Sequence, residues 1–591
     1  MSPKANSALK IRLPVWRARL VVTFIFLGFI SLVGRAFDLQ IWNTALYQAK
    51  ANERFVRSSE ILADRGIIRD RNGEELAVSS RVHRVIADPS RSFMGERPEG
   101  APKDAKSVSM EQIVALADLL DIDAVTLEKF LSLQKSYKIL KKEIPPQLAD
   151  KVMSLAIPGI YLETMYKRFW PLAEDTAQLI GATSGNHVGQ EGLELLFQSR
   201  LEGESGSRRF IKDNKGRAID MLKVSEPLHG ASITLSVDKI IQHQAYEAVK
   251  AAGVEHNAKS ASIVVLDAIT GEVLALSNWP SYNPNNRKTF DPEIMRNKAI
   301  LDMFEPGSTI KPFTMAAALE RGVIHPDSSI DIEGGRTFIG GRKVIDTHPK
   351  EGLYSASDVI RRSSNVGVAK ISQMFERQHL WEALRDAGFG QKPETGFPGE
   401  SPGKLTPPDV WKDMDHVSIS FGYTMQVTLL QLARAYTIFA REGTLAPITF
   451  EKRTEAVTGE RVISKDSANN VLLMMEKVTQ EGGTATLAAV PGYRVAGKTG
   501  TTKKQVNGKY VKEYISSFVG LAPVSNPRVV IGVMVEDPKS GKYYGGHVAG
   551  PAFRAVMESA LRQLGVTPDQ LPNGIEVKNR SPQTEYDVVL N

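Results

Sequence analysis

An uncharged apolar run near the N-terminus constrains the fold of this chain more than any other sequence feature. Residues 20–34 carry no charged side chain, and apolar residues continue to Ile41. As a helix, residues 20–41 would extend roughly 33 Å, which is enough to cross the hydrocarbon core of a bilayer. No second run of comparable length and apolarity follows in the sequence. The sequence therefore predicts one membrane-spanning helix attached to a large body outside the bilayer.

The charged residues before this run predict its orientation. Residues 1–19 contain five basic residues and no acidic one, whereas the whole chain has 74 basic and 67 acidic residues. By the positive-inside rule, this tail stays in the cytoplasm and the body is carried across the membrane. The body itself is close to neutral, so its charge gives no reason to expect a nucleic acid as partner.

A cleaved signal peptide is the alternative to a membrane anchor. Its cleavage site would consist of small residues directly behind the apolar run. The nearest such sequence, Ala49-Lys50-Ala51, lies far beyond the run. We therefore expect an uncleaved signal anchor and a single-pass protein.

The exported body changes character near residue 230. Residues 42–230 mix strand-like runs with helices. Ser109 to Gln112 fits a capping box that opens a helix. The lysines at 135–142 are interpreted as a solvated helix face. After residue 230, we expect strands at 262–267, 272–277, 514–521 and 528–536, with long helices between 309 and 480. The predicted parts are a basic tail at 1–19, the anchor at 20–41, domains at 42–230 and 231–572, and a polar tail at 573–591.

Composition removes several classes of chemistry. The chain has no cysteine, which excludes disulfides, thiol nucleophiles and cysteine-bound metals. Its ten histidines are scattered, and none lies within four residues of another, so the helical zinc motif H-E-x-x-H is absent. We expect neither a catalytic metal nor a cofactor.

Residues 492–499 match the nucleotide-binding P-loop pattern G-x-x-x-x-G-K-[ST] letter for letter. A P-loop requires a helix directly after its lysine and threonine, so that backbone amides face the phosphates. Here Gly500, Thr501 and Thr502 follow, and a turn at Asn507-Gly508 comes next. This pattern favours an extended strand that enters a hairpin, and it argues against nucleotide binding.

The same Lys498-Thr499-Gly500 also belongs to a set of three motifs, S-x-x-K, S-x-N and K-T-G, found in serine acyltransferases. Of four S-x-x-K sequences, the one at Ser308 follows a turn and opens a predicted helix over 309–320. Pro312 fits in the first turn of that helix, where backbone N–H groups have no intrahelical partner. Ser308 and Lys311 would then share one helical face within hydrogen-bond reach.

The chemistry of these residue types agrees with this placement. A serine hydroxyl is a weak nucleophile until an adjacent base activates it. A lysine serves as that base only if burial or a second cation lowers its pKa. Lys498 is the expected second cation, and it can also bind a substrate carboxylate.

Ser363-Ser364-Asn365 precedes another predicted helix and supplies the S-x-N motif. Ser363 could relay a proton to a leaving amine, and Asn365 could orient Lys311 or a substrate amide. Rival S-x-N sequences begin at 184 and 467, and a rival K-[ST]-G begins at 539. Only the motifs at 308, 363 and 498 combine order, spacing and suitable local structure.

These residues resemble the active-site-serine penicillin-binding proteins, and the resemblance extends over nearly the whole exported chain. Segments similar to the catalytic domain of the cell-division members lie at 281–285, 304–308, 363–367, 497–501 and 543–546. Segments similar to the non-catalytic domain of the class B, single-pass members lie at 65–73, 168–171 and 189–194. The resemblance implies an α/β (α+β) transpeptidase domain, with an antiparallel sheet flanked by helices. It also implies an elongated α+β pedestal domain before it and one N-terminal transmembrane helix.

The activity that the resemblance implies is that of a septal peptidoglycan D,D-transpeptidase in the inner membrane, with a periplasmic catalytic domain. Ser308 would be acylated by the penultimate D-Ala of a stem pentapeptide, and β-lactams would trap it. The residues implied in catalysis are Ser308, Lys311, Ser363, Asn365 and Lys498, and those implied in substrate binding are Thr499, Gly500 and Thr501. Backbone N–H groups of Ser308 and Thr501 would form the oxyanion hole.

Partners implied by the family are a membrane glycan polymerase and other cell-division proteins. Several positions depart from the family pattern. Thr424 replaces a usual glycine, Leu429 a common proline and Gln178 an expected histidine. The usual glycine after Pro171 is missing, and His547 is unusual at its position. The alternatives are an elongation-type or paralogous transpeptidase, and a non-catalytic β-lactam sensor or scaffold on the same fold.

Overall fold

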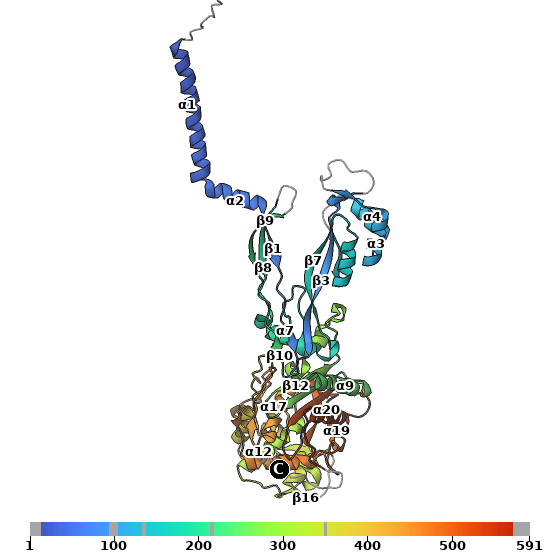
Figure 1. The fold of residues 1–591 in the computed structure, drawn as a ribbon. Helices are drawn as coiled ribbons and strands as arrows, with labels where there is room; N and C mark the ends of the chain where they lie inside the picture. The colour runs from blue at the N-terminus through green and yellow to red at the C-terminus, as the bar shows by residue number, and fades with distance from the viewer. Residues whose placement is uncertain are drawn as a thin grey trace, which may run out of the picture. The chain divides into compact units, whose positions relative to one another are not determined.

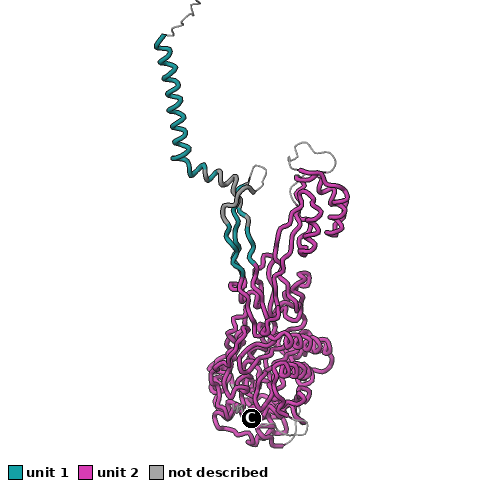
Figure 2. The backbone as a smooth tube through the Cα atoms, in the orientation of Figure 1, with its two compact units in different colours: residues 1–63, 203–229 teal, residues 64–202, 230–591 magenta. Residues whose placement is uncertain are grey.

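The computed structural model describes residues 14–93, 105–132, 138–212, 218–347, 352–506 and 508–570. The chain divides into two compact units, residues 1–63 with 203–229 and residues 64–202 with 230–591 (Figure 2). The predicted boundaries at 19, 41, 230 and 572 remain predictions. The polar tail expected at 573–591 and most of the basic N-terminal tail lie outside the described residues.

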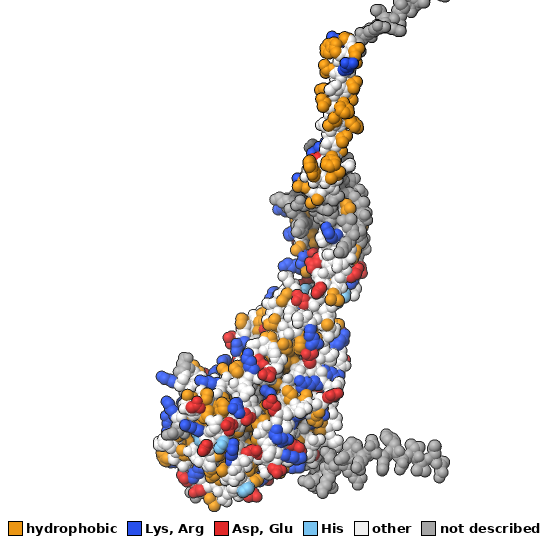
Figure 3. Space-filling view, turned by 90° about the vertical axis from the view of Figure 1, so that its left-hand side faces the viewer, with side chains coloured by type: hydrophobic (Ala, Val, Ile, Leu, Met, Phe, Trp, Pro, Cys, Tyr) orange, Lys and Arg blue, Asp and Glu red, His pale blue; other side chains and the backbone are white. Residues whose placement is uncertain are grey.

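The first unit contains the apolar helix. α1 spans Val15–Phe37 and continues through a π-helical turn at Asp38–Trp42, and its most apolar window has a mean hydropathy of 2.2. No residue of α1 is buried, and exposed hydrophobic side chains recur along it from Val15 to Phe37. Figure 3 shows them on one face of the helix. Arg35 donates a hydrogen bond to Asp38 at 2.6 Å, so the charges that interrupt the run are paired. A helix that is apolar on all sides needs apolar surroundings, which agrees with the predicted membrane span.

Behind the helix, the first unit forms a small sheet. α2 (Thr44–Phe55) leads into three antiparallel strands in the order β1 (Val56–Ile61), β8 (Gly206–Lys212) and β9 (Ala218–Ser225). The last two strands come from a segment far along the chain, so this sheet depends on a long-range pairing.

The second unit begins with a sheet around the long strand β3 (Glu75–Ala87). β3 pairs antiparallel with β7 (Ile160–Phe169), β6 (Lys138–Ile144) and β2 (Ile68–Arg69), and β10 (Ile233–Thr234) pairs in parallel with β2. A separate apolar core joins this sheet to α3 (Met110–Leu120), α4 (Ala124–Ser132) and α5 (Pro146–Ser154).

Two sequence predictions fall in this region. The capping box is confirmed, because Ser109 accepts from the backbone of Gln112 at 3.2 Å and the Gln112 side chain accepts from the backbone of Ser109 at 3.1 Å. The interpretation of the lysines at 138–142 as a helix face is wrong, because Lys138–Ile144 is the strand β6. Residues 135–137 of the same prediction lie outside the described residues. Pairing with β3 decides this local structure, whereas charge alone does not distinguish an exposed helix from an exposed strand.

The second sheet is entirely antiparallel and carries the site. Its order is β12 (Val273–Trp279), β11 (Ser260–Asp267), β21 (Val529–Glu536), β20 (Lys509–Ala522) and β19 (Ala496–Val506), which confirms the strands expected from the sequence. α9 (Lys239–Glu255) and α20 (Gly550–Gln563) cover one face, and α17 (Leu429–Ala440) covers the other (Figure 1). β19 is the edge strand, so one of its sides is left for other contacts.

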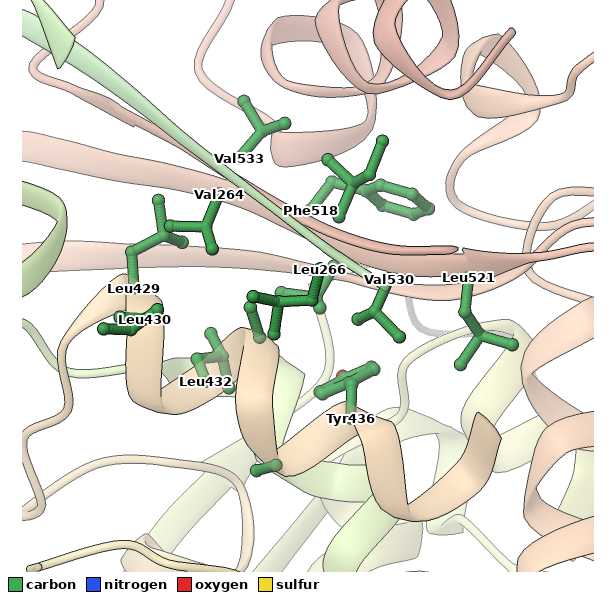
Figure 4. Close-up of a cluster of buried hydrophobic side chains, with 14 of the residues drawn as sticks. Val264, Leu266, Leu429, Leu430, Leu432, Tyr436, Phe518, Leu521, Val530 and Val533 are labelled. Carbon is green, nitrogen blue, oxygen red and sulfur yellow. The ribbon is translucent and has the colours of Figure 1, made fainter. Parts of the chain in front are cut away.

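The packing of α17 shows how the sheet is held. Leu429, Leu432 and Tyr436 of α17 lie against Leu266 and Val530 of the sheet (Figure 4). On the opposite face, Phe518 packs edge-on against Phe553 of α20, with ring centroids 4.7 Å apart. Both faces of the sheet are therefore buried, which explains the continuous apolar runs in β11 and β21.

A helical region completes the second unit. Its elements include α11 (Lys298–Leu301), α12 (Lys311–Glu320), α13 (Ala356–Arg361), α14 (Asn365–Ser372), α15 (Arg377–Asp386), α16 (Asp413–Ser420) and α18 (Lys465–Glu476), and the hairpin β14 (Arg336–Ile339) and β15 (Arg342–Ile345). α12 contacts α14, α15 and α18, so the helix that carries Lys311 is surrounded by other helices.

Candidate active site

Ser308 lies at the entry to a buried helix. A 3₁₀ turn at Gly307–Ile310 leads into α12, so α geometry begins at Lys311 rather than at residue 309 as predicted. Such turns are common where helices begin, and Pro312 lies in the first turn of α12 as expected. Ser308 is partly exposed, whereas Lys311 is completely buried. Ser308 is thus partly accessible to solvent, whereas the Lys311 amine is removed from water.

Two glycines let the Ser308 turn approach strand β19. Gly307 has a φ of +56°, and a Cβ there would lie 2.3 Å from the side chain of Thr502. A Cβ at Gly500 would lie 2.9 Å from the carbonyl oxygen of Pro306. Side chains at either glycine would push the turn and the strand apart.

The Lys311 amine joins the first two motifs. Its Nζ donates to the carbonyl oxygen of Ser363 at 2.7 Å, to the Ser363 hydroxyl at 3.3 Å and to Oδ1 of Asn365 at 2.8 Å. The structure therefore brings Lys311, Ser363 and Asn365 together as the sequence predicted.

Ser363 adopts an unusual backbone conformation to make this contact. Its φ is +59°, in the left-handed region that a non-glycine residue rarely occupies. Ser364 caps α14 by accepting from the backbone of Gly367 at 2.9 Å. The turn that precedes this cap aims the Ser363 carbonyl at Lys311, and backbone strain of this kind collects at functional sites.

Asp346 is a site residue that sequence reasoning missed. Its carboxylate accepts from the backbone of Asn365 at 2.6 Å, from the backbone of Val366 at 2.9 Å and from the Ser364 hydroxyl at 2.7 Å. It is 6% exposed and stabilises the N-terminus of α14, where an anion is favoured. No sequence motif marks it, because it follows a hairpin and reaches Asn365 only in the folded chain.

The third motif lies on the edge strand β19. Lys498 is completely buried, and its Nζ donates to the Thr499 carbonyl at 3.4 Å. The Thr499 hydroxyl lies 2.9 Å from that of Thr484, and the Thr501 hydroxyl accepts from the backbone of Gly545 at 3.0 Å. A strand rather than a helix follows Lys498, so the match to the P-loop pattern does not form a P-loop.

Burial sets the electrostatics of the two lysines. Removal from water lowers the pKa of Lys311 to about 7, although the negative charge of Asp346 favours its protonated form. Burial also lowers the pKa of Lys498 well below its usual value, and the positive charge of Lys311 lowers it further. The sequence analysis offered burial or a second cation as the cause of a lowered Lys311 pKa, and in the structure the cause is burial. Lys311 is therefore able to accept a proton near neutral pH.

A group of tyrosines lies next to β19. The rings of Tyr514 and Tyr543 stack with centroids 4.3 Å apart, and the ring of Tyr544 lies 4.6 Å from that of Tyr543. The Ser516 hydroxyl donates to the Tyr543 carbonyl at 2.6 Å and ties this group to β20. The sequence marked the two tyrosines at 543 and 544 but gave no sign that Tyr514 would join them.

Three of the departures from the family pattern have structural consequences. Thr424 adopts a φ of +59°, the left-handed conformation that glycine adopts more easily. Leu429 is the first residue of α17, a position that favours proline. Gln178 is buried and donates to the carbonyl oxygens of Pro280 and Ile294 at 2.9 and 3.0 Å. Each of these positions lies outside the three motifs.

Within the described residues, no group of three or more histidine, aspartate and glutamate side chains is arranged to hold a metal ion.

Comparisons with known proteins identify both domains. Residues 261–558 match the penicillin binding protein transpeptidase domain, and residues 60–235 match the penicillin-binding protein dimerisation domain. The chain is 37% identical over 589 residues to the probable peptidoglycan D,D-transpeptidase PenA of Neisseria meningitidis, which covers 98% of each chain. It is 36% identical over 563 residues to the peptidoglycan D,D-transpeptidase FtsI of Escherichia coli, which covers 95% of this chain and 94% of FtsI.

Solved structures agree with these matches. The transpeptidase domain of penicillin-binding protein 3 from Burkholderia pseudomallei is 40% identical, with a TM-score of 0.53 over 57% of this chain and 97% of that one. A peptidoglycan synthetase from Bifidobacterium adolescentis shares the fold over 90% of this chain and 98% of its own, with a TM-score of 0.68 at 24% identity. The chain belongs to the penicillin-binding protein family, with the transpeptidase and dimerisation domains of its class B members.

Proposed function

We propose that this chain is a peptidoglycan D,D-transpeptidase that cross-links stem peptides during septal wall synthesis. The observation that supports it most is the completely buried Lys311 amine, which follows Ser308 by three residues and donates to Ser363 and Asn365. Burial lowers the pKa of this amine to about 7. The PenA and FtsI relatives carry the same activity in their names.

In the first step, Ser308 attacks the carbonyl carbon of the penultimate D-Ala of a stem pentapeptide. Neutral Lys311 takes the proton from the hydroxyl, and the backbone N–H groups of Ser308 and Thr501 stabilise the oxyanion. Each such donor is typically worth about 3 kcal/mol. The C–N bond then breaks, the terminal D-Ala leaves with a proton relayed through Ser363, and an acyl-Ser308 ester remains.

Lys498 and Thr499 bind the terminal carboxylate of the donor stem before this step. Burial and the positive charge of Lys311 both oppose protonation of Lys498 and so favour its neutral form. An incoming carboxylate supplies the missing negative charge and favours the protonated amine. Binding of substrate therefore charges Lys498, which in turn favours a neutral Lys311, the form that acts as base.

In the second step, a side-chain amine of another stem attacks the acyl-Ser308 ester. The amine loses a proton to the base, the ester bond breaks and the Ser308 hydroxyl is restored. The product is an amide cross-link between two stems. β-Lactams, which mimic the D-Ala-D-Ala terminus, acylate the same serine.

For the cellular setting, we propose that α1 anchors the chain in the inner membrane with its N-terminus in the cytoplasm and the catalytic domain in the periplasm. The five basic residues at 1–19 support this orientation. By family resemblance, the partners are a membrane glycan polymerase and other division proteins.

Acylation of the full-length protein by a fluorescent penicillin, beside a Ser308→Ala variant, tests the acyl-transfer site. We expect a covalent adduct that the variant loses, followed by cross-linked product when glycan strands with pentapeptide stems are supplied. If the folded protein forms no adduct, the proposed enzymatic activity is wrong and a non-catalytic scaffold is favoured. An adduct that survives Ser308→Ala would place the nucleophile on another serine.

A further inference from the structure

Glu305 lies three residues before Ser308, in the loop that leads to the nucleophile. It is only 8% exposed, and burial raises the pKa of its carboxyl group. Within the described residues, no lysine, arginine or histidine forms an ion pair with it. A buried carboxylate without a basic partner destabilises a fold, and groups of this kind collect at functional sites. Glu305 is thus a candidate for a role in the reaction at Ser308.

One oxygen of this carboxylate joins two other segments of the chain. Oε1 accepts from the backbone N–H of Thr424 at 2.9 Å and from the hydroxyl of Tyr510 at 3.2 Å. Thr424 lies in the loop after α16, and Tyr510 lies at the start of β20. The other oxygen, Oε2, is buried and has no hydrogen-bond partner among the described residues. The carboxylate of Glu305 therefore connects these segments through a single acceptor atom.

The backbone around Glu305 reaches the edge strand β19. The Glu305 carbonyl oxygen accepts from the Thr502 hydroxyl at 3.1 Å. Gly307 lies against the same residue, since a Cβ at this glycine would be 2.3 Å from the Thr502 side chain. Thr502 directly follows Thr501, and Gly307 directly precedes Ser308. Glu305 therefore joins the two segments that supply the backbone N–H groups of the proposed oxyanion hole.

Aromatic packing holds Tyr510 in place for its contact with Glu305. Its ring meets that of Tyr423 edge-on with centroids 6.0 Å apart, and the ring of Tyr423 meets that of Phe421 at 5.8 Å. The next residue, Thr424, has a φ of +59°, a conformation that is strained for a residue with a side chain. The loop therefore keeps a strained backbone at the position whose N–H donates to Glu305.

We propose that Glu305 is a positioning residue for acylation, which fixes β19 relative to the Ser308 turn and so sets the spacing of the Ser308 and Thr501 backbone N–H groups. This inference rests on the proposed function, because an oxyanion forms only when Ser308 attacks a carbonyl carbon. Donors of an oxyanion hole act only when they are aimed at the position where charge develops. A misplacement of about 1 Å can lower the rate about 10²-fold.

The first test measures acylation of the full-length chain at increasing concentrations of a fluorescent penicillin. Glu305→Met replaces the carboxylate by an apolar side chain of similar length, whereas Glu305→Gln keeps an acceptor in the place of Oε1. In Glu305→Met, we expect the limiting rate of acylation to fall about 10- to 100-fold, while the half-saturating concentration changes by less than about twofold. The reason is that the hole stabilises the transition state rather than the bound penicillin. Glu305→Gln should retain most of the rate.

A second measurement distinguishes positioning from a contribution to stability alone. Infrared difference spectra of the acylated protein, with the penicillin carbonyl carbon labelled by ¹³C, give the stretching band of the Ser308 ester. Hydrogen bonds from the oxyanion hole polarise this carbonyl and lower its frequency. We therefore expect the band of Glu305→Met at a higher wavenumber than that of the wild-type protein. Thermal unfolding of each variant shows that it is folded, and a change of stability alone would leave the band in place.

Tyr510→Phe tests the same contact from the other side, and because Tyr510 is 47% exposed it serves even if Glu305→Met does not fold. It removes one donor to Oε1, so both readouts should shift in the same direction by a smaller amount. The double variant should be no slower than Glu305→Met, because the two residues act through one contact. Glu382→Met, which removes a partly exposed carboxylate from α15, is the control and should leave both readouts unchanged.

The outcomes separate this inference from the proposed function. An unchanged rate and band in folded Glu305→Met or in Tyr510→Phe would overturn the positioning role, while the acyl-transfer site at Ser308 would stand. Glu305→Gln as slow as Glu305→Met would overturn it as well, because the acceptor at Oε1 would then be irrelevant. Absence of an adduct in the folded wild-type protein would overturn both the function and the inference.

Discussion

Positively charged side chains are buried in two regions of the second unit, and the two regions differ in whether a carboxylate is paired with them. In the pedestal, Arg65 and Arg168 both donate to the fully buried Glu194, each at 2.7 Å. At the catalytic centre, Lys311 and Lys498 are equally buried, and neither makes an ion pair within the described residues. Burial lowers the pKa of both lysines. Burial also lowers the pKa of Arg168, but there the negative charge of Glu194 opposes the shift.

This difference separates structural from chemical use of a buried cation. A guanidinium paired with a carboxylate has a counter-charge and acceptors for its N–H groups. It therefore holds strands together and does not react. An amine without a counter-ion in a dry site is driven toward its neutral form, which is a base. Ser363, whose carbonyl accepts from Lys311, also has a left-handed backbone conformation with a φ of +59°.

The largest effect is expected from removal of the catalytic amine. Lys311→Met should lower the rate of acylation by penicillin by about 10³-fold or more, because Ser308 loses its general base. Stopped-flow measurement with a fluorescent penicillin gives the rate. Lys370→Met, which removes an ion-paired lysine from α14, serves as the matched control and should acylate normally. Rapid acylation of Lys311→Met would show that Lys311 is not the general base.

Removal of the Glu194 carboxylate, which Arg65 and Arg168 share, tests whether this buried ion pair stabilises the pedestal. Glu194→Gln should lower the free energy of unfolding of the second unit by about 3–5 kcal/mol, because two buried guanidinium groups lose their counter-ion. Denaturant unfolding measures this. Glu163→Gln, which breaks the exposed pair with Arg84, should cost less than about 1 kcal/mol. Equal losses in both variants would contradict a structural role of the buried pair.

The pH dependence of acylation tests whether Lys311 acts as the base. Acylation should rise with pH through about 7 as Lys311 loses its proton. Asp346→Asn removes a negative charge that favours protonated Lys311, so the midpoint of the rise should move to lower pH. Acylation rates measured from pH 5 to pH 9, about two units on either side of neutrality, give both midpoints. A midpoint that stays in place or moves upward would contradict this electrostatic role of Asp346.

The smallest effect concerns backbone strain. Thr424→Gly should raise the free energy of unfolding by about 0.5–1 kcal/mol, since glycine adopts a φ of +59° without steric penalty. Thr424→Ala keeps the penalty and is the control. Its backbone N–H donates to Glu305 at 2.9 Å in either variant, so the contact itself is retained. A gain shared by both variants would mean that the side chain, rather than the backbone, is responsible.

Much of the fold and the site followed from local pattern. The apolar run near the N-terminus, the strands of the second sheet and the turn before Ser308 were all predicted, because period, charge and turn residues are local properties. The strand β6 was not predicted. Its lysine-rich sequence is compatible with an exposed helix as well as with an exposed strand. Pairing with β3 makes it a strand.

The sequence by itself determined which residue types stand at 308, 311, 363 and 498 and the local structure that carries each. Only the tertiary structure decided that Lys311 is buried beside Ser363 and that Asp346 reaches the start of α14. The physical reason is that a pKa and a hydrogen bond depend on dielectric surroundings and distance, which are set by segments far apart in the chain.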